Sequence, residues 1–139
     1  MCHQHREDTN HLFLSCAIAS TLWNYITDLF SCRWLHSDSI FSHLMWCVEV
    51  DYSRKITNIF LSAIVELFHV IWYVINNLIH HTHSFNLNAD RTRIITAIQD
   101  AALTQKSHYD NSVRDFMILR HLRIEGIYKK LRHTIEVFW

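Results

Sequence analysis

Residues 54–80 form the stretch that most limits how this chain can fold, because they are almost entirely apolar between Ile56 and Ile79. The polar exceptions recur at intervals of 4, 4, 3, 4 and 3 residues: Asn58, Ser62, Glu66, His69, Tyr73 and Asn76. On an α-helix this spacing places them in one narrow stripe. The pattern therefore predicts a long, largely buried helix with a polar edge, along which Asn58, Glu66 and His69 lie.

The same helix is long enough to cross a bilayer. However, Glu66 and His69 would then lie near the bilayer centre, where an ionised carboxylate costs about 2.5–3.5 kcal/mol on insertion scales. We therefore favour a soluble buried helix. A small membrane-associated protein that spans once near residues 56–79 is the alternative, and detergent-dependent solubility would distinguish the two.

On the apolar side of this helix we expect a packed set of side chains. The set comprises Ile64, Leu67, Phe68, Ile71, Trp72 and Ile75. For Trp72→Ala this interpretation predicts a loss of about 3–5 kcal/mol of stability.

Apolar spacing predicts further helices on both sides of the long one. One covers residues 17–30 with Trp23 in the core, and a short one follows Ser37 or Asp38 as N-cap. A third is capped by Asn88 or Asp90 and ends near Leu103, and a fourth follows Asp110 or Ser112. One glycine and no proline leave little turn chemistry and no phosphate-binding loop. We expect one all-α domain over residues 1–139 with a small irregular helical fold. Residues 1–23 would form an N-terminal knuckle and the start of the first helix, and residues 24–139 the helical region.

Charge gives no long-range attraction for nucleic acid, since 13 basic residues balance 13 acidic ones. The only locally basic segment is the last thirty residues or so. Its cationic side chains include Arg120, Arg123, Lys129, Lys130 and Arg132. Any binding to RNA or DNA would have to use this segment, and a solvated helix face is the competing interpretation.

Near the start, Cys2, His11 and Cys16 stand in a C-x8-H-x4-C frame. These ligands can converge on a tetrahedral Zn²⁺, at roughly 2.0–2.3 Å, if a short knuckle leads into a helix.

The other cysteines and histidines of the chain are less specific. Cys32 and Cys47 are isolated and are expected to be inert core thiols. Glu66 and His69 form half of a carboxylate-bridged metal motif, but without facing carboxylates a polar edge is favoured. The histidines at 80, 81 and 83 are expected to lie at a helix end.

The residues from Glu7 to Cys16, followed by Ala19 and Trp23, resemble the zinc-binding region after the polymerase in plant non-LTR (LINE-type) retrotransposon reverse transcriptases. That family reads C-x2-C, an acidic segment, H-L-F, two residues, C, and a Trp in the next helix. In this alignment Cys2, His11 and Cys16 are the second to fourth ligands. The first would precede Met1, so we expect an N-terminally truncated fragment with a weakened zinc site, which His5 could complete as a substitute ligand. A metal-free N-terminus, with Leu12, Phe13 and Cys16 docked on the helical core, is the competing interpretation. Residues 71–76, 111–119 and 135–139 resemble later landmarks more weakly.

The resemblance implies a non-catalytic, zinc-binding module between polymerase and ribonuclease H domains. It would contact element RNA or target DNA, act in the nucleus and take no small-molecule substrate. The acidic residues are too dispersed for two-metal chemistry, so we expect no enzyme activity. A degenerate copy with no selected function is the competing hypothesis, because Ile75 replaces the arginine of the family's I-W-x-x-R-N landmark.

Overall fold

The computed structural model describes residues 8–33, 39–80, 86–104 and 113–123. Within these ranges every regular element is helical, and no strand is present. The elements are η1 (His11–Ser15), α1 (Ala17–Leu29), α2 (Ile40–Glu49), α3 (Arg54–His80), α4 (Leu87–Thr104) and α5 (Val113–His121). The predicted all-α class, built around one long helix, is confirmed.

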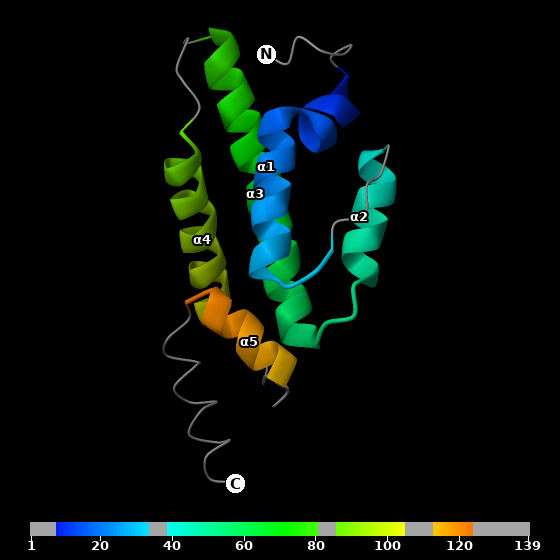
Figure 1. Ribbon diagram of the computed structural model, residues 1–139, viewed down its shortest axis with the longest axis vertical. Helices are drawn as coiled ribbons and strands as arrows, with labels where there is room; N and C mark the ends of the chain where they lie inside the picture. Colours follow the sequence, from blue (N-terminus) through cyan, green and yellow to red (C-terminus); the bar gives the residue numbers. More distant parts are fainter. Residues whose placement is uncertain (1–7, 34–38, 81–85, 105–112, 124–139) are drawn as a thin grey trace, which may run out of the picture.

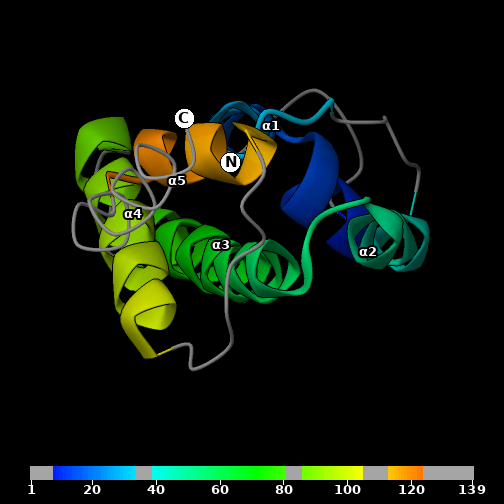
Figure 2. The same cartoon turned by 90° about the horizontal axis from the view of Figure 1, so that it is seen from below.

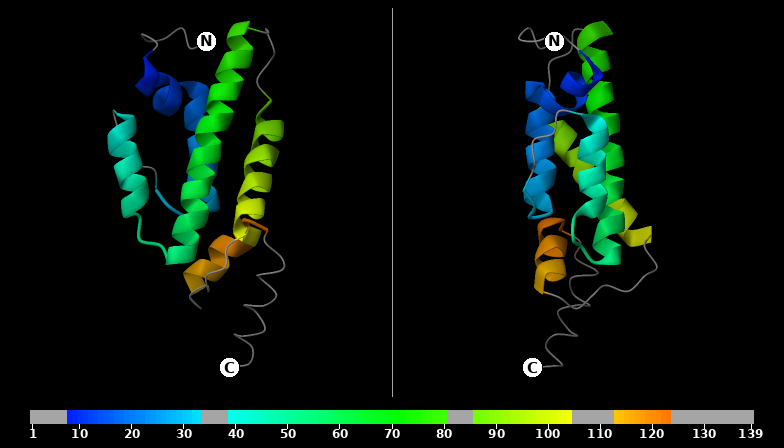
Figure 3. Two further views of the ribbon diagram at one scale, coloured as in Figure 1. Left: turned by 180° about the vertical axis from the view of Figure 1, so that it is seen from behind. Right: turned by 90° about the vertical axis from the view of Figure 1, so that its right-hand side faces the viewer.

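The long helix α3 is the centre of the fold, as Figure 1 shows, and α1, α2 and α4 all run alongside it. Seen from below, α4 and α2 lie on opposite sides of α3, while α1 and α5 cover a third side (Figure 2). The view from behind leaves α3 in front, with no described helix over it (Figure 3). The described helices therefore leave one side of α3 uncovered.

Burial in the core follows the helical period. On α3 the buried apolar side chains are Ile56, Ile59, Phe60, Ala63, Ile64, Leu67, Val70, Ile71 and Val74. Helix α1 contributes Ala19, Leu22, Trp23 and Ile26, and α4 contributes Ile94, Ile98 and Ala102, which lie four residues apart. Because α3 is contacted from several directions, it buries a wider arc than a surface helix would.

The predicted polar edge of α3 is confirmed in outline. Asn58 is half-buried, and the side chains of Glu66 and His69 are 24% and 55% exposed. The prediction for Trp72 is wrong, because this residue is 55% exposed. Val65, Trp72 and Ile79 follow one another at seven-residue intervals, which is close to two helical turns, and all three are exposed. They form the open strip of α3.

Side-chain caps set the helix starts, and two of them differ from the prediction. Ser39 caps α2, since its Oγ accepts the Ser42 amide at 3.1 Å. Ser37 and Asp38, the predicted caps, lie outside the described residues. The Asn86 side chain caps α4 by accepting the Ala89 amide at 3.1 Å. The predicted Asn88 and Asp90 are instead inside the first turn of α4, and the predicted Asp110 and Ser112 are not among the described residues.

Helix α3 is the one described helix whose length and composition would allow it to cross a membrane. A buried core helix passes the same test. Its inward face is covered by α1, α2 and α4, so much of its apolar surface is already removed from solvent.

The two tryptophans provide a stability test of this arrangement. Trp23 is fully buried, so Trp23→Ala is expected to lower the free energy of unfolding by about 3–5 kcal/mol. Trp72→Ala is the matched control, and as an exposed-surface change it should stay within about 0.5 kcal/mol. Urea titrations followed by circular dichroism measure both. Equal losses for the two variants would contradict the assignment of the open strip.

Candidate functional site

The predicted knuckle is a single wide turn, η1, held by hydrogen bonds at both ends. Asp8 Oδ1 accepts the His11 amide at 2.8 Å, and the Asp8 carbonyl accepts the Leu12 amide at 3.0 Å. At the other end the Cys16 amide donates to the His11 carbonyl at 2.8 Å, which is the five-residue bond of a π-turn. Two of the predicted zinc ligands, His11 and Cys16, therefore stand at the two ends of one turn.

Cys16 also starts helix α1. Its backbone is extended, and its Sγ accepts the Ala19 amide at 3.4 Å, so the thiol is the N-cap of the helix. The same sulfur donates to the Leu12 carbonyl at 3.4 Å. A metal-bound thiolate would lose the second bond but keep the first, in a position where the helix N-terminus favours negative charge.

His11 is almost fully buried, and its Nδ1 lies 3.3 Å from the Ser15 hydroxyl. In zinc sites the ring nitrogen that does not bind the metal usually has such a partner, which fixes the ring orientation. Ser15 would have this role for His11. The sequence analysis did not select Ser15. Its position four residues after His11, about one helical turn away, could have indicated a contact between the two side chains.

The other two predicted ligands, Cys2 and His5, lie outside the described residues. Within the described ranges no group of three or more His, Cys, Asp or Glu side chains is placed to hold a metal ion. The predicted zinc set has only His11 and Cys16 in those ranges, so zinc binding stays a prediction.

The knuckle is attached to the core at three points. Trp23 Nε1 donates to the Phe13 carbonyl at 2.8 Å, and the Phe13 ring lies 5.4 Å from that of Phe68 on α3. Asn10 Oδ1 accepts the first amide of α2, that of Ile40, at 3.0 Å. The residues that carry the family resemblance thus have architectural roles in this fold.

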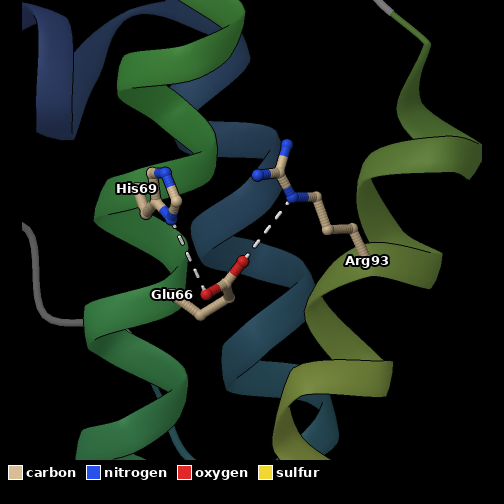
Figure 4. Close-up of polar contacts among 3 residues, drawn as sticks. All are labelled: Glu66, His69 and Arg93. Carbon is tan, nitrogen blue, oxygen red and sulfur yellow. Dashed lines mark ion pairs between the residues drawn. The ribbon is translucent and has the colours of Figure 1, made fainter.

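The half-motif on α3 forms a charge cluster instead of a metal site (Figure 4). Glu66 Oε2 is 3.9 Å from His69 Nδ1, and Glu66 Oε1 is 3.7 Å from Arg93 Nε on α4. Arg93 also lies over the Tyr73 ring, 4.6 Å from its centroid. A guanidinium facing the single carboxylate opposes cation binding there, as the interpretation of a polar edge implies.

The two remaining described thiols, Cys32 and Cys47, lie around Tyr52. Burial raises the pKa of Cys47 to about 12, and the neighbouring Cys32 adds to the shift. Burial also raises the pKa of Cys32, although a side-chain hydrogen bond with Tyr52 opposes it. The Tyr52 hydroxyl donates to the Phe30 carbonyl at 2.7 Å. These thiols stay protonated at neutral pH, in agreement with the expectation of inert core residues.

Of the predicted basic residues, Arg120 and Arg123 are described, and both are exposed at the end of α5. Lys129, Lys130 and Arg132 lie outside the described residues. Arg91 on α4, which the sequence analysis did not select, lies over the Tyr25 ring of α1, 5.1 Å from its centroid. Arg91 could have been found from its position three residues before the buried Ile94, which places it at the edge of the face that α4 packs against the core.

The chain matches no protein-family model, no curated protein and no solved structure. Its function is therefore argued from its own residues.

The raised pKa of Cys47 predicts a pH dependence of stability. Between about pH 9 and 12 the thiol ionises in the unfolded chain but not in the folded one, so the folded state holds more protons. The free energy of unfolding should then fall as pH rises through this window, by at most about 1.4 kcal/mol per pH unit from this group.

Urea titrations between pH 8 and 10 measure the slope, and Cys47→Ala is expected to flatten it. Cys16→Ser is the control, because it replaces a thiol on another element and serine keeps the helix cap. An unchanged slope in Cys47→Ala would show that burial does not hold this thiol in its neutral form.

Proposed function

We propose that this chain is a zinc-binding, nucleic-acid-contacting module of the kind found in plant non-LTR retrotransposon reverse transcriptases, and that it is not itself catalytic. The observation that carries the proposal is the η1 turn. It holds His11 and Cys16 at its two ends directly before α1, whose Trp23 binds the Phe13 carbonyl. This local order is the one that the family pattern requires.

In this proposal zinc has a structural role. Cys2, His11 and Cys16 would bind it, with His5 as the fourth ligand, because structural zinc sites are almost always four-coordinate. The ion would tie the segment before residue 8 to the start of α1. Structural zinc sites contribute on the order of 10 kcal/mol or more to folding, and one imidazole in place of a thiolate would weaken that contribution.

Nucleic acid would be bound through phosphate contacts by the basic residues at and after the end of α5. Arginine and lysine contacts to phosphate supply affinity without sequence preference and make it salt-dependent. Arg120 and Arg123 support this part of the proposal, since both are exposed. Element RNA or target DNA is the expected partner.

The zinc site has a sharp test in Cys16→Ser. Serine caps a helix well but does not bind structural zinc, so the variant should keep α1 and lose the metal. We expect at most one zinc per untagged wild-type chain by metal analysis, and none in Cys16→Ser or His11→Ala. Cys47→Ala, which removes a buried cysteine outside the ligand set, should retain it. Tight stoichiometric zinc that survives replacement of both Cys2 and His5 would refute the ligand set.

RNA binding is tested by replacing Arg120, Arg123, Lys129, Lys130 and Arg132 with glutamine. Wild-type affinity for single-stranded or structured RNA should be weak and should fall as salt rises, with a slope of about −0.7 per phosphate contact for single strands. The fivefold variant should lose most of it. Arg33→Gln/Arg54→Gln is the control, since both residues are exposed elsewhere. Identical retention of the fivefold variant on an RNA column would dispose of the proposal.

These two measurements also identify a degenerate copy. A chain that folds with the expected helical content but binds neither zinc nor RNA would be a structural remnant of the module.

The second candidate function is a small membrane-associated protein with α3 as its span. The observation in its favour is the open strip of α3, where Val65, Trp72 and Ile79 are exposed and apolar. Purification with and without detergent distinguishes it from the first candidate. A monodisperse chain without detergent supports the nucleic-acid module.

A further inference from the structure

The outer face of α2 carries a stripe of exposed apolar side chains. Their spacing of i, i+3, i+4 and i+7 places them on one side of the helix. The members of this apolar stripe are Phe41, Leu44, Met45 and Val48. Single exposed apolar residues are normal on a protein surface, but four in one helical stripe make a contiguous patch, which is typical of an interaction site.

The opposite face of α2 is already packed against the core. His43 and Cys47 are buried, and the His43 ring meets that of Trp23 edge-on at 4.2 Å. Trp46 approaches Phe60 of α3, with 6.4 Å between the ring centroids. Figure 2 shows α2 at one edge of the bundle, with no described helix on its outer side. Because α2 cannot turn without losing these contacts, a partner that covers the apolar stripe has to approach from outside the bundle.

The apolar stripe is complementary to a second copy of itself in an antiparallel pair. A two-fold axis between Leu44 and Met45 would set these two residues of the two copies opposite each other. The same axis would set Phe41 opposite Val48, so that a large ring faces a small side chain at both ends of the pair. A parallel pair would instead place ring against ring at one end and valine against valine at the other, which fills the two ends unequally.

The charges around α2 favour the same arrangement. Glu49 is the only Asp, Glu, Lys or Arg among residues 39–50, and it is exposed. In an antiparallel pair each Glu49 would lie near the N-terminus of the other copy's α2, where the helix dipole stabilises a carboxylate. In a parallel pair the two carboxylates would lie near each other and repel. The chain has zero formal net charge, so no overall repulsion opposes the association of two copies.

The area of the apolar stripe indicates how strong such a pair would be. Phe41 is 74% exposed, and the other three residues are 39–54% exposed. With about 150–250 Å² for a whole aromatic side chain and roughly half of that for an aliphatic one, the stripe presents about 200–350 Å² of apolar surface. A standard interface removes about 800 Å² from each partner, a little over half of it apolar. The stripe supplies roughly half of that apolar area, which fits a weak, reversible dimer.

We infer that the apolar stripe of α2 is a self-association surface, through which two copies of this chain form a weak antiparallel dimer. The inference goes beyond the proposed function, since the contact needs neither zinc nor nucleic acid. It also differs from the membrane candidate, which uses α3.

The test is sedimentation equilibrium of the untagged full chain without detergent. We expect a monomer–dimer equilibrium with a dissociation constant on the order of 100 µM, measured at concentrations on both sides of that value. Leu44→Lys and Met45→Glu each place a charge in the apolar contact. Each should raise the dissociation constant by at least about tenfold, because the charge would be buried without a partner.

An equimolar mixture of these two variants tests the antiparallel register. Residues 44 and 45 of the two copies face each other in this register, so the introduced lysine and glutamate would form one ion pair per heterodimer. The mixture should therefore contain dimer that neither variant forms alone. A mixture that stays monomeric, under conditions where the wild type dimerises, overturns the inference.

Leu103→Glu is the matched control. Leu103 is 70% exposed, much as Phe41 is, but it lies on α4, on the other side of α3 from α2. Its dissociation constant should stay within about twofold of wild type. Urea titration confirms that every variant is folded. If Leu44→Lys or Met45→Glu does not fold, Phe41→Glu and Val48→Lys provide the equivalent opposite pair.

The remaining outcomes are distinct from those that test the proposed function. A chain that is monomeric throughout overturns the inference, and so does a dimer that Leu44→Lys and Met45→Glu leave unchanged, since its interface would lie elsewhere. Flotation with phosphatidylcholine–phosphatidylserine vesicles tests a lipid surface as the occupant. Vesicle binding by a monomeric wild type that Phe41→Glu abolishes would assign the apolar stripe to lipid and overturn the dimer. Zinc and RNA binding are measured separately and stand or fall independently of these results.

Discussion

The indole of Trp23 connects four elements of this structure. It is fully buried in α1, its Nε1 donates to the Phe13 carbonyl of η1, and its ring meets His43 of α2 edge-on at 4.2 Å. On α3 it meets Phe68 at 5.8 Å. Four elements therefore depend on one side chain that combines large apolar area with one hydrogen-bond donor.

This junction couples the candidate zinc knuckle to the core. His11 and Cys16 lie on either side of the segment that contains Phe13, and that segment is held by Trp23 and Phe68. A metal bound at the ends of the turn would act on a backbone already fixed at its middle. Conversely, the turn does not need metal to be defined, since Asp8 and Cys16 already close it with backbone and side-chain bonds.

Helix positions could be predicted from the sequence because apolar periodicity is a local property. Helix α3 was placed at residues 54–80 and α1 at 17–30, within one residue of the observed ends. The side of a helix that faces inward was harder to predict where apolar residues occur all round it. Trp72 is predicted on the packed side of α3, yet its side chain is 55% exposed.

Helix α2 shows the same difficulty in a stronger form. Its apolar residues Phe41, Leu44, Met45 and Val48 are all exposed, whereas His43 and Cys47 are buried. Amphipathic spacing alone would predict the opposite orientation, with these apolar residues facing the core. Its orientation depends instead on long-range partners, namely the ring of Trp23 and the Asn10 side chain, which no local pattern reveals.

Contacts of single residues could likewise be predicted only where the partners are close together in the sequence. The ligands His11 and Cys16 were found from their spacing, because a turn brings neighbours in sequence together. Arg91 and Tyr25 were not found, since they are far apart in the chain and meet only when α4 packs beside α1. Total charge does not reveal this contact either, because what matters locally is which groups folding places beside each cation.

The arginines of the described residues differ in what lies beside the guanidinium group. Where a carboxylate faces the guanidinium, as Glu66 faces Arg93, the two charges compensate each other and the ion pair links α3 to α4. Where no described carboxylate does, as at Arg91, the guanidinium lies over an aromatic ring instead, that of Tyr25. Zero net charge therefore does not mean that every cation has an acid beside it, because among the described residues folding pairs only some of them.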